Sequence, residues 1–395
     1  MSGVGTWVVL AGLVLAAGFR TRASAGSIDP AGQADFGALG WVVSQAGGGL
    51  LGNAAGVAAI VVAVVLIQLP FDLVGGYVLP RKHGRTADRF GAFAWRWLRG
   101  VSVYAGAMLG LGLPMLGASA LVGGWGMAGV GVAASMALLA FRTPLARAVG
   151  GLSRATAGGL PDGADAAPFG RGMTVLSADD GGFTGGTGGV LSARSQILPD
   201  RWVRQLEPEE LLLVIRRRRE AAVSGLWLRG RLGALAFVWI GLVVSGLVST
   251  GVEPTGVASG ASAGSAEAVL RFAAVFTLWS FVGLLVLPTL SRRASLAIDE
   301  RLRAGGVDAS DLRSVAMRLD TMQDGEPDRP GWIEAVFHPI PSVASRRSRG
   351  GGGRLAAWDI ARTAAFLGLC GLSPLGRAVH CNSGRPALWV YLPLD

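Results

Sequence analysis

Long apolar segments are the feature that most constrains how this 395-residue chain folds. A helix needs about 20 mostly apolar residues to cross the hydrocarbon core of a bilayer. Hydrophobic residues make up 51% of the chain and charged residues 16%, against about 25% charged residues in soluble domains. The sequence therefore predicts a mainly α, polytopic membrane protein with about six transmembrane helices. The expected spans are Val4 to Phe19, Ala54 to Leu69, Val101 to Val122, Gly124 to Phe141, Leu232 to Thr250 and Val269 to Leu290.

Two apolar segments are ambiguous. No charge precedes Arg20, whereas a secretory signal peptide begins with a positive region. An Ala-Ser-Ala sequence at 23–25 resembles a cleavage site, but we favour an uncleaved anchor for the first span. A seventh stretch, Ala364 to Leu375, is too short to span, and we interpret it as a buried or interfacial helix.

The charge pattern predicts the orientation in the membrane. The chain carries 36 basic and 26 acidic residues, a net charge of +10. Arginines crowd the loops after the second, fourth and sixth spans, while the loop 251–267 contains Glu253 and Glu267 but no Lys or Arg. Basic residues collect in cytoplasmic loops. We therefore expect an integral protein of a bacterial cytoplasmic membrane with both termini cytoplasmic. This topology explains the positive charge without nucleic-acid binding.

The same pattern divides the chain into five parts. We expect a membrane region with four spans at 1–141 and two further spans at 232–290. Three parts are expected to be cytoplasmic: 142–231, a group of helices at 291–354, and a C-terminal helix and tail at 355–395.

The cytoplasmic insert has recognisable local signals. Residues 173–180 and 190–198 have the pattern of strands, and the glycine-rich run 181–189 between them predicts a small β-hairpin. The run lacks the Lys-Ser or Lys-Thr pair of a phosphate-binding loop, so we interpret its glycines as structural. Glu207-Pro208 predicts the start of a helix. Its four arginines, 216–219, cover a full helical turn and cannot all face solvent.

Three further segments follow the last span. Residues 291–304 predict a helix that Gly305-Gly306 ends. Residues 310–322 predict another helix, with Ser310 as its N-cap. The basic, glycine-rich stretch 346–354 is expected to be mobile.

These motifs together resemble a known family. The order is Gly182-Phe-Thr-Gly, then Leu-x-Pro-Glu-Glu-Leu-x-x-Val-Ile at 206–215, Ser-Arg-Arg with a later Asp at 291–299, and His338-Pro339. Over roughly residues 66–350 the chain resembles the membrane zinc metallopeptidases that include the CAAX prenyl protease and the HtpX heat-shock protease. The resemblance implies a cytoplasmic, gluzincin-like α+β domain that contains the small β-hairpin.

The chain departs from that family at its metal site. The family carries His-Glu-x-x-His, in which two His bind zinc and the Glu is the general base. Arg217 and Ala221 stand here at the His positions, Arg218 stands at the Glu position, and Ser295 stands at a third ligand. Arginine has no lone pair for a metal. The resemblance thus implies a degenerate member without catalytic residues, metal ligands or zinc.

Three interpretations of function remain open. The first is a catalytically inactive pseudoprotease that binds a membrane protein, a peptide or lipid. The second is an active zinc-dependent endopeptidase whose ligands are relocated to His338, His380, Cys381 and an Asp or Glu, although no His pair, His83 included, has the helical i, i+4 spacing. The third is a membrane scaffold that binds anionic lipids through its arginine-rich loops. Enzymatic activity is undecided, and the missing ligands favour its absence.

One residue of the family motif persists, Asp299. The resemblance gives this Asp the role of supporting a zinc-binding His. Without that His and zinc, a lone carboxylate in a shielded cleft is costly. We therefore predict that Asp299 pairs with an arginine of the 216–219 run, with Arg217 nearest by alignment. The C-terminal His380-Cys381 segment has no assigned role, and Cys370 and Cys381 are expected to be thiols.

Overall fold

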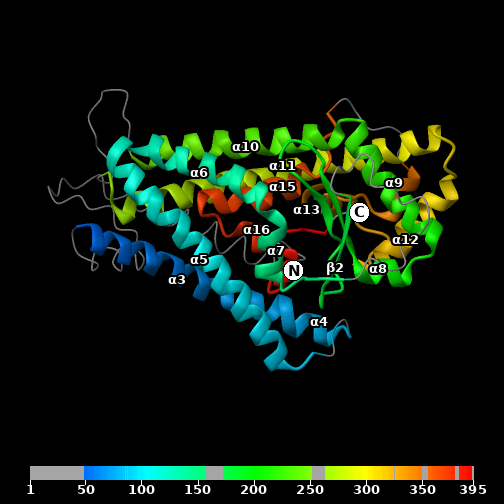
Figure 1. Cartoon of the computed structure of the whole chain (residues 1–395), viewed down its shortest axis with the longest axis horizontal. Helices are drawn as coiled ribbons and strands as arrows, with labels where there is room; N and C mark the ends of the chain where they lie inside the picture. The colour runs from blue at the N-terminus through cyan, green and yellow to red at the C-terminus, as the bar shows by residue number, and fades with distance from the viewer. Residues whose placement is uncertain are drawn as a thin grey trace. The chain divides into compact units, whose positions relative to one another are not determined.

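The computed structural model describes residues 49–84, 86, 88–155, 172–250, 263–323, 325–348, 355–378 and 382–393. These residues form a mainly helical protein with one small mixed sheet (Figure 1). The chain divides into two compact units, which we call the first and the second unit. The first unit comprises Met1–Ser135, Val238–Phe281 and Leu367–Gly384, and the second comprises Met136–Phe237, Val282–Phe366 and Arg385–Asp395.

Four continuous helical stretches are long and apolar enough to cross a membrane. They are α3 (Leu50–Leu73) with its continuation to Lys82, α5 (Phe90–Val122), α10 (Leu226–Ser249) and α11 (Ala266–Ala304). The bent pair α6 (Gly124–Ala140) and α7 (Arg142–Gly150), with an angle of 80°, adds a fifth stretch if the two helices form one span. These stretches contain five of the six predicted spans and indicate an integral membrane protein. The remaining predicted span, 4–19, lies outside the described residues.

The continuation of α3 is not a regular α-helix. A π-helical turn, η2 (Val74–Val78), separates α3 from the short helix α4 (Leu79–Lys82). Single π-helical turns inside α-helices are rare and frequently mark functional sites. This turn begins two residues after Asp72, a buried carboxylate of α3.

Small residues allow the helices of the first unit to approach closely. A Cβ atom added to Gly124 of α6 would lie 1.9 Å from the carbonyl oxygen of Gly246 in α10. Trp239 of α10 donates a hydrogen bond of 2.9 Å from its indole nitrogen to the Ser135 hydroxyl of α6. Close approach at glycines is typical of helix contacts in membranes, where burial of apolar surface does not drive association.

The predicted short apolar helix near the C-terminus is buried. It corresponds to α15 (Ile360–Leu367) and the 3-10 helix η3 (Gly368–Gly371), which are followed by α16 (Leu375–Ala378). Gly371 packs directly on Phe276 of α11, because a Cβ at this position would lie 2.1 Å from the aromatic ring. Neither α15 nor η3 is among the helices long enough to span.

The second unit contains a four-stranded sheet of order β1-β2-β4-β3. The predicted hairpin between residues 173–180 and 190–198 is wrong, because β2 and β4 pair in parallel. The connection between β2 and β4 is long enough for β4 to run in the same direction as β2. The glycine-rich run within this connection contributes β3, which pairs antiparallel with β4. The strands are β1 (Ser153–Arg154), β2 (Met173–Ser177), β3 (Gly186–Gly188) and β4 (Ser195–Pro199).

Helices pack on this sheet through one apolar core. Leu198 and Trp202 from β4 and the following helix contact Val214 of the next helix and Val315 and Leu319 of a later one. The helices of this core are α8 (Asp200–Gln205), α9 (Pro208–Val223) and α12 (Ala309–Gln323). The unit also contains α13 (Gly331–Phe337), α14 (Val343–Ser348) and the 3-10 helix η4 (Pro386–Leu388).

Two local predictions need correction. The amide of Ser310 donates to the Asp308 carboxylate at 2.9 Å, so Asp308 caps α12 one residue before its first helical position, not Ser310. The stretch 346–354 begins inside α14, and Arg346 is held there by an ion pair, so its first residues are ordered by a partner that the sequence pattern does not reveal. Residues 349–354 lie outside the described residues.

Candidate functional site at the Arg217–Asp299 helix pair

Helix α9 begins with a capping box that fixes which arginines turn inward. Glu207 is the N-cap, Pro208 is the first helical residue, and the side chain of Glu210 accepts the Glu207 amide at 3.1 Å. This arrangement satisfies amide groups that have no partner within the helix. From this start, Arg217 and Arg218 lie on the buried face, with 5% and 0% exposure. Arg216 and Arg219 are exposed, as expected when four consecutive arginines cover a whole turn.

Helix α11 presents the second half of the site. Ser295 and Asp299 lie one turn apart and are both buried. Ala221 of α9 packs in one apolar cluster with Ala294 and Ile298 of α11, so the two helices lie side by side. Gly305 and Gly306 follow the helix, and Gly306 has a φ of 88°, a left-handed conformation that suits glycine at a helix end.

The structure brings Arg217 and Asp299 together. The Nε atom of Arg217 lies 2.9 Å from Oδ1 of Asp299, and both side chains are less than 10% exposed. Arg346 of α14 binds the other oxygen, Oδ2. Asp299 therefore joins three helices, α9, α11 and α14, through two charge-assisted hydrogen bonds.

Arg218 has a different role from its neighbour. It donates to the carbonyl oxygens of Ile197 at 2.8 Å and Thr184 at 2.7 Å, and its guanidinium lies over the Trp202 ring at 5.3 Å. These contacts tie α9 to β4 and to the glycine-rich segment before β3. Arg218 thus satisfies backbone acceptors at the sheet and does not belong to the Asp299 group.

The side chain of Glu334 on α13 orients the helix that carries Arg346. Its Oε2 atom accepts hydrogen bonds from Ser342 at 2.7 Å and Ser345 at 2.8 Å, beside the start of α14. Burial alone would raise the pKa of Glu334, but these two hydroxyl groups stabilise the carboxylate and its pKa is lowered. Glu334 is 2% exposed and was not identified by the sequence analysis, because no motif surrounds it.

The residues that the resemblance aligns with the zinc site do not fit zinc. Structural and catalytic zinc sites use Cys, His, Asp or Glu donors. Here Arg217, Arg218 and Ala221 offer no donor to a metal. Throughout the described ranges, no group of three or more His, Cys, Asp or Glu side chains is placed to hold a metal ion.

Of the residues considered as relocated zinc ligands, His338 lies within the described part of the chain. His83 is exposed after α4, and His338-Pro339 is partly buried after α13. His380 and Cys381 lie outside the described residues. Cys370 is buried in η3 as a free thiol.

Another buried ion pair, in the first unit, was missed by the sequence analysis. Asp72 of α3 pairs with Arg377 of α16. Its carboxylate also accepts hydrogen bonds of 2.9 Å from the Trp97 indole and from the Gly384 amide. Ionisable residues within membrane helices are rare and are usually functional or paired. The available signal was Asp72 itself, a carboxylate at the end of an apolar run.

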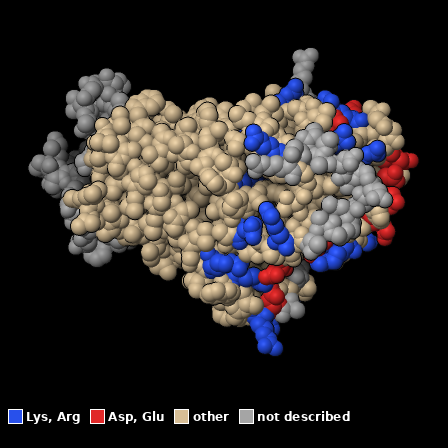
Figure 2. All heavy atoms as spheres, viewed as in Figure 1, with Lys and Arg blue, Asp and Glu red and all other residues tan. Residues whose placement is uncertain are grey.

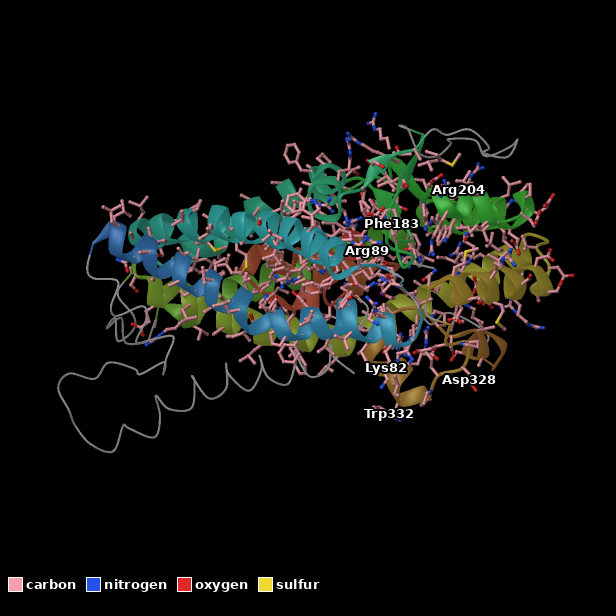
Figure 3. All side chains as sticks on the ribbon, turned by 90° about the horizontal axis from the view of Figure 1, so that it is seen from below. Lys82, Arg89, Phe183, Arg204, Asp328 and Trp332 are labelled. Carbon is pink, nitrogen blue, oxygen red and sulfur yellow. The ribbon has the colours of Figure 1, made fainter. Side chains whose placement is uncertain are left out.

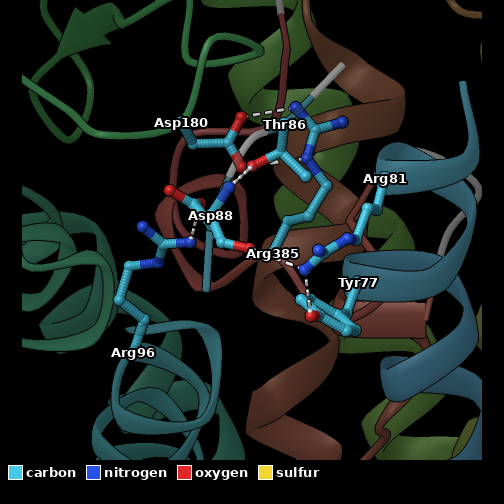
Figure 4. Close-up of polar contacts among 7 residues, drawn as sticks. All are labelled: Tyr77, Arg81, Thr86, Asp88, Arg96, Asp180 and Arg385. Atoms are coloured by element: carbon cyan, nitrogen blue, oxygen red, sulfur yellow. Dashed lines mark hydrogen bonds and ion pairs between the residues drawn. The ribbon is translucent and has the colours of Figure 1, made fainter. Parts of the chain in front are cut away.

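Two more polar groups hold loops in place (Figure 4). In the second unit, Arg385 forms a two-point contact with Asp180, with Nε 2.8 Å from Oδ2. Burial would raise the pKa of Asp180, but the Arg385 charge and hydrogen bonds lower it. In the first unit, Arg81 donates to the Tyr77 hydroxyl at 2.6 Å and to the Asp88 carbonyl at 3.3 Å.

Comparison with known proteins adds no identification. No protein-family model matches the chain, and a search of curated proteins finds no similar sequence.

Proposed function

We propose that this chain is a membrane-embedded, metallopeptidase-like protein that does not hydrolyse peptides and instead binds a membrane protein or peptide partner. The proposal rests on the sequence resemblance to the membrane zinc metallopeptidases. Its main structural support is the Arg217–Asp299 contact, which lies between the two helices that this alignment pairs. Fold alone does not define function, so the binding role is an inference from scaffold and lost chemistry.

The charges at the site explain how such a scaffold is held without a metal. A metal ion would supply positive charge between α9 and α11. Two guanidinium groups supply positive charge around Asp299 instead, and they form directional bonds to both carboxylate oxygens. Both oxygens of Asp299 are engaged by guanidinium groups, which have no lone pair with which to bind a metal, and this supports a structural role for the group.

The first experiment measures the natural chain. The full-length protein, purified in a neutral detergent, should contain far less than one zinc per chain and should not cleave casein. About one zinc per chain together with casein cleavage would overturn the proposal and favour the relocated-ligand alternative.

A second experiment tests the helix alignment independently of activity. The triple variant Arg217→His, Ala221→His, Ser295→Glu places three zinc-type ligands on the facing sides of α9 and α11 and keeps Asp299 to support a His. We expect about one zinc per chain after zinc loading and dialysis. The matched control, Arg217→His with Ser295→Glu, lacks one ligand and should retain none. Equal zinc in both variants would count against the alignment.

A second candidate function is anionic-lipid binding at the connection between α4 and α5. Arg81, Lys82 and Arg89 are exposed there, and Phe90 and Trp95 are 55% and 66% exposed. Figure 3 labels Lys82 and Arg89 at this connection. On the face drawn in Figure 2, the basic atoms gather in patches while the surface over the apolar stretches of α5 and α6 is uncharged. Exposed basic and aromatic side chains at the ends of spans suit the headgroup region.

Vesicle binding discriminates this candidate from ordinary topology. The protein in neutral detergent is mixed with phosphatidylcholine vesicles with or without phosphatidylglycerol, at low and high salt. Specific binding predicts a salt-sensitive preference for the anionic vesicles that the triple variant Arg81→Gln, Lys82→Gln, Arg89→Gln loses. Equal partitioning of the variant and the natural chain would remove this candidate.

A further inference from the structure

Two buried arginines of the second unit lie outside every site discussed above. Arg142 is the first residue of α7, and Arg231 lies in the second turn of α10. They are 4% and 1% exposed. Both guanidinium groups stack on aromatic rings, so their flat faces are covered and their N–H edges point sideways. Arg142 lies over Tyr391 at 4.5 Å and Phe366 at 5.1 Å, and Arg231 lies over Trp227 at 4.8 Å.

The negative charge near these arginines is insufficient. Asp359 is the carboxylate in the described part of the chain that acts on both of them. Its Oδ2 atom is 4.0 Å from Nη1 of Arg142, which is longer than a hydrogen bond. Two positive charges thus face one negative charge in a buried region. Arg142 also donates from Nε to the Val390 carbonyl at 3.1 Å, but a carbonyl carries no net charge. An uncompensated buried charge is costly, so a further anion would stabilise the group.

The donors of Arg231 are incompletely used. Nη1 donates to the Thr363 hydroxyl at 3.2 Å, but the Nε atom is buried and has no hydrogen-bond partner within the described residues. Buried polar atoms of native proteins nearly always have a partner, which includes ligands and ordered water. The unpartnered donor and the excess positive charge both favour an additional acceptor beside Arg231.

The start of α7 strengthens this inference. No acidic residue lies in its first turn, and no side chain caps it. Helix N-termini carry partial positive charge and favour anions. The buried Arg142 at this N-terminus adds a further positive charge. Next to it, the hydroxyl groups of Thr143 and Tyr391 form a hydrogen bond of 2.9 Å and add further polar atoms.

We propose that the group formed by Arg142, Arg231, Asp359, Thr363 and Tyr391 binds the phosphate of an anionic ligand, either a lipid headgroup or free inorganic phosphate. The planar N–H edges of arginine match the oxygens of phosphate in a two-point geometry. The proposal is independent of the function proposed above, because none of these residues contacts the Arg217–Asp299 pair.

The first test uses inorganic phosphate. Thermal unfolding of the full-length protein in a neutral detergent is followed with increasing sodium phosphate and with sodium chloride at matched ionic strength. We expect a saturable rise in Tm of at least about 3 °C that is specific to phosphate. Arg231→Gln should abolish the rise. Arg229→Gln, two residues earlier on the exposed side of α10, should keep it.

A conservative variant covers the case in which Arg231→Gln does not fold. Arg231→Lys keeps the charge but loses the planar fork, and should need roughly tenfold more phosphate for half the effect. Equal responses of the natural chain to phosphate and to chloride would overturn binding of free phosphate.

The lipid arm identifies the other source. In phosphate-free buffer, the protein is placed in nanodiscs of phosphatidylcholine with or without phosphatidylglycerol. If a headgroup is the ligand, phosphatidylglycerol raises the Tm of the natural chain and of Arg229→Gln more than that of Arg231→Lys. The proposal fails if the Tm values of the Arg231 variants and of Arg229→Gln change equally with phosphate and equally with phosphatidylglycerol.

Discussion

At the scale of single residues, buried charges are held by several partners each. Asp299 binds two arginines, Asp72 binds Arg377, an indole and an amide, and Arg218 binds two carbonyl oxygens. A buried ion pair adds little net stability compared with apolar residues. Its removal from one side is expensive, because the partner charge stays buried alone. These residues therefore specify which elements meet.

Replacing Asp299 should be strongly destabilising. Asp299→Ala leaves Arg217 and Arg346 buried without their carboxylate, and we expect a loss of about 3–5 kcal/mol in the free energy of unfolding. The control Glu300→Ala changes the exposed neighbour on the same helix and should cost less than about 0.5 kcal/mol. Chemical denaturation in detergent measures both, and equal values would contradict the role assigned to Asp299.

Acid should weaken the contact between Asp180 and Arg385. The pKa of Asp180 is lowered in the folded protein, so the carboxylate contributes stability above its unfolded pKa of about 3.9. That contribution is lost as the pH falls through the folded value. The natural chain should be more stable than Asp180→Asn at pH 7, and the difference should shrink below about pH 4. Unfolding midpoints of both proteins across this range provide the measurement. A difference that is independent of pH would refute the assignment.

At the scale of elements, glycine contacts and caps decide how the helices meet. The spans of the first unit approach through glycines, whereas α9 and α12 depend on side-chain caps at Glu207 and Asp308. Periodicity and capping residues locate such helices from sequence. They do not show which glycine faces a neighbour, since every glycine in an apolar run has the same local pattern.

Gly124 provides a test of close helix packing. Gly124→Ala places a methyl group against the Gly246 carbonyl of α10 and should cost about 1–3 kcal/mol, because the helices must separate. Gly129→Ala on the same helix meets no atom within 4 Å and should be neutral or slightly stabilising. Thermal unfolding of the two variants in one detergent makes the comparison. If both variants lose the same stability, close packing at Gly124 is not the cause of the loss.

At the scale of the whole molecule, the sequence predicts the class of fold better than it predicts which strands and side chains pair. Apolar length located the described spans, and the Glu207-Pro208 signal located α9. The sheet was predicted as a hairpin because strand patterns do not encode partner order, and β2 pairs in parallel with β4. Arg346, Glu334 and Arg377 were missed for a related reason: their partners are distant in sequence, and nothing local marks them.

Orientation in the membrane remains a prediction from the basic loops. With Cys370 and Cys381 replaced, a single cysteine at the exposed position Arg219 should react with an impermeant maleimide only after the cells are opened. A cysteine at Leu121, which is 86% exposed at the end of α5, should react in intact cells. The reverse pattern would invert the proposed topology.

The π-helical turn at Val74–Val78 has a consequence for insertions and deletions. Such a turn is equivalent to one extra residue in an α-helix, and each α-helical residue turns the chain by about 100°. The extra residue therefore sets the angle at which Arg81 leaves the helix and donates to Tyr77 and Asp88. Shortening this turn by a single residue would keep the span apolar and long enough to cross a bilayer. It would nevertheless rotate the basic end of the helix to another direction. The number of residues in this turn, more than their composition, therefore determines where that basic end points.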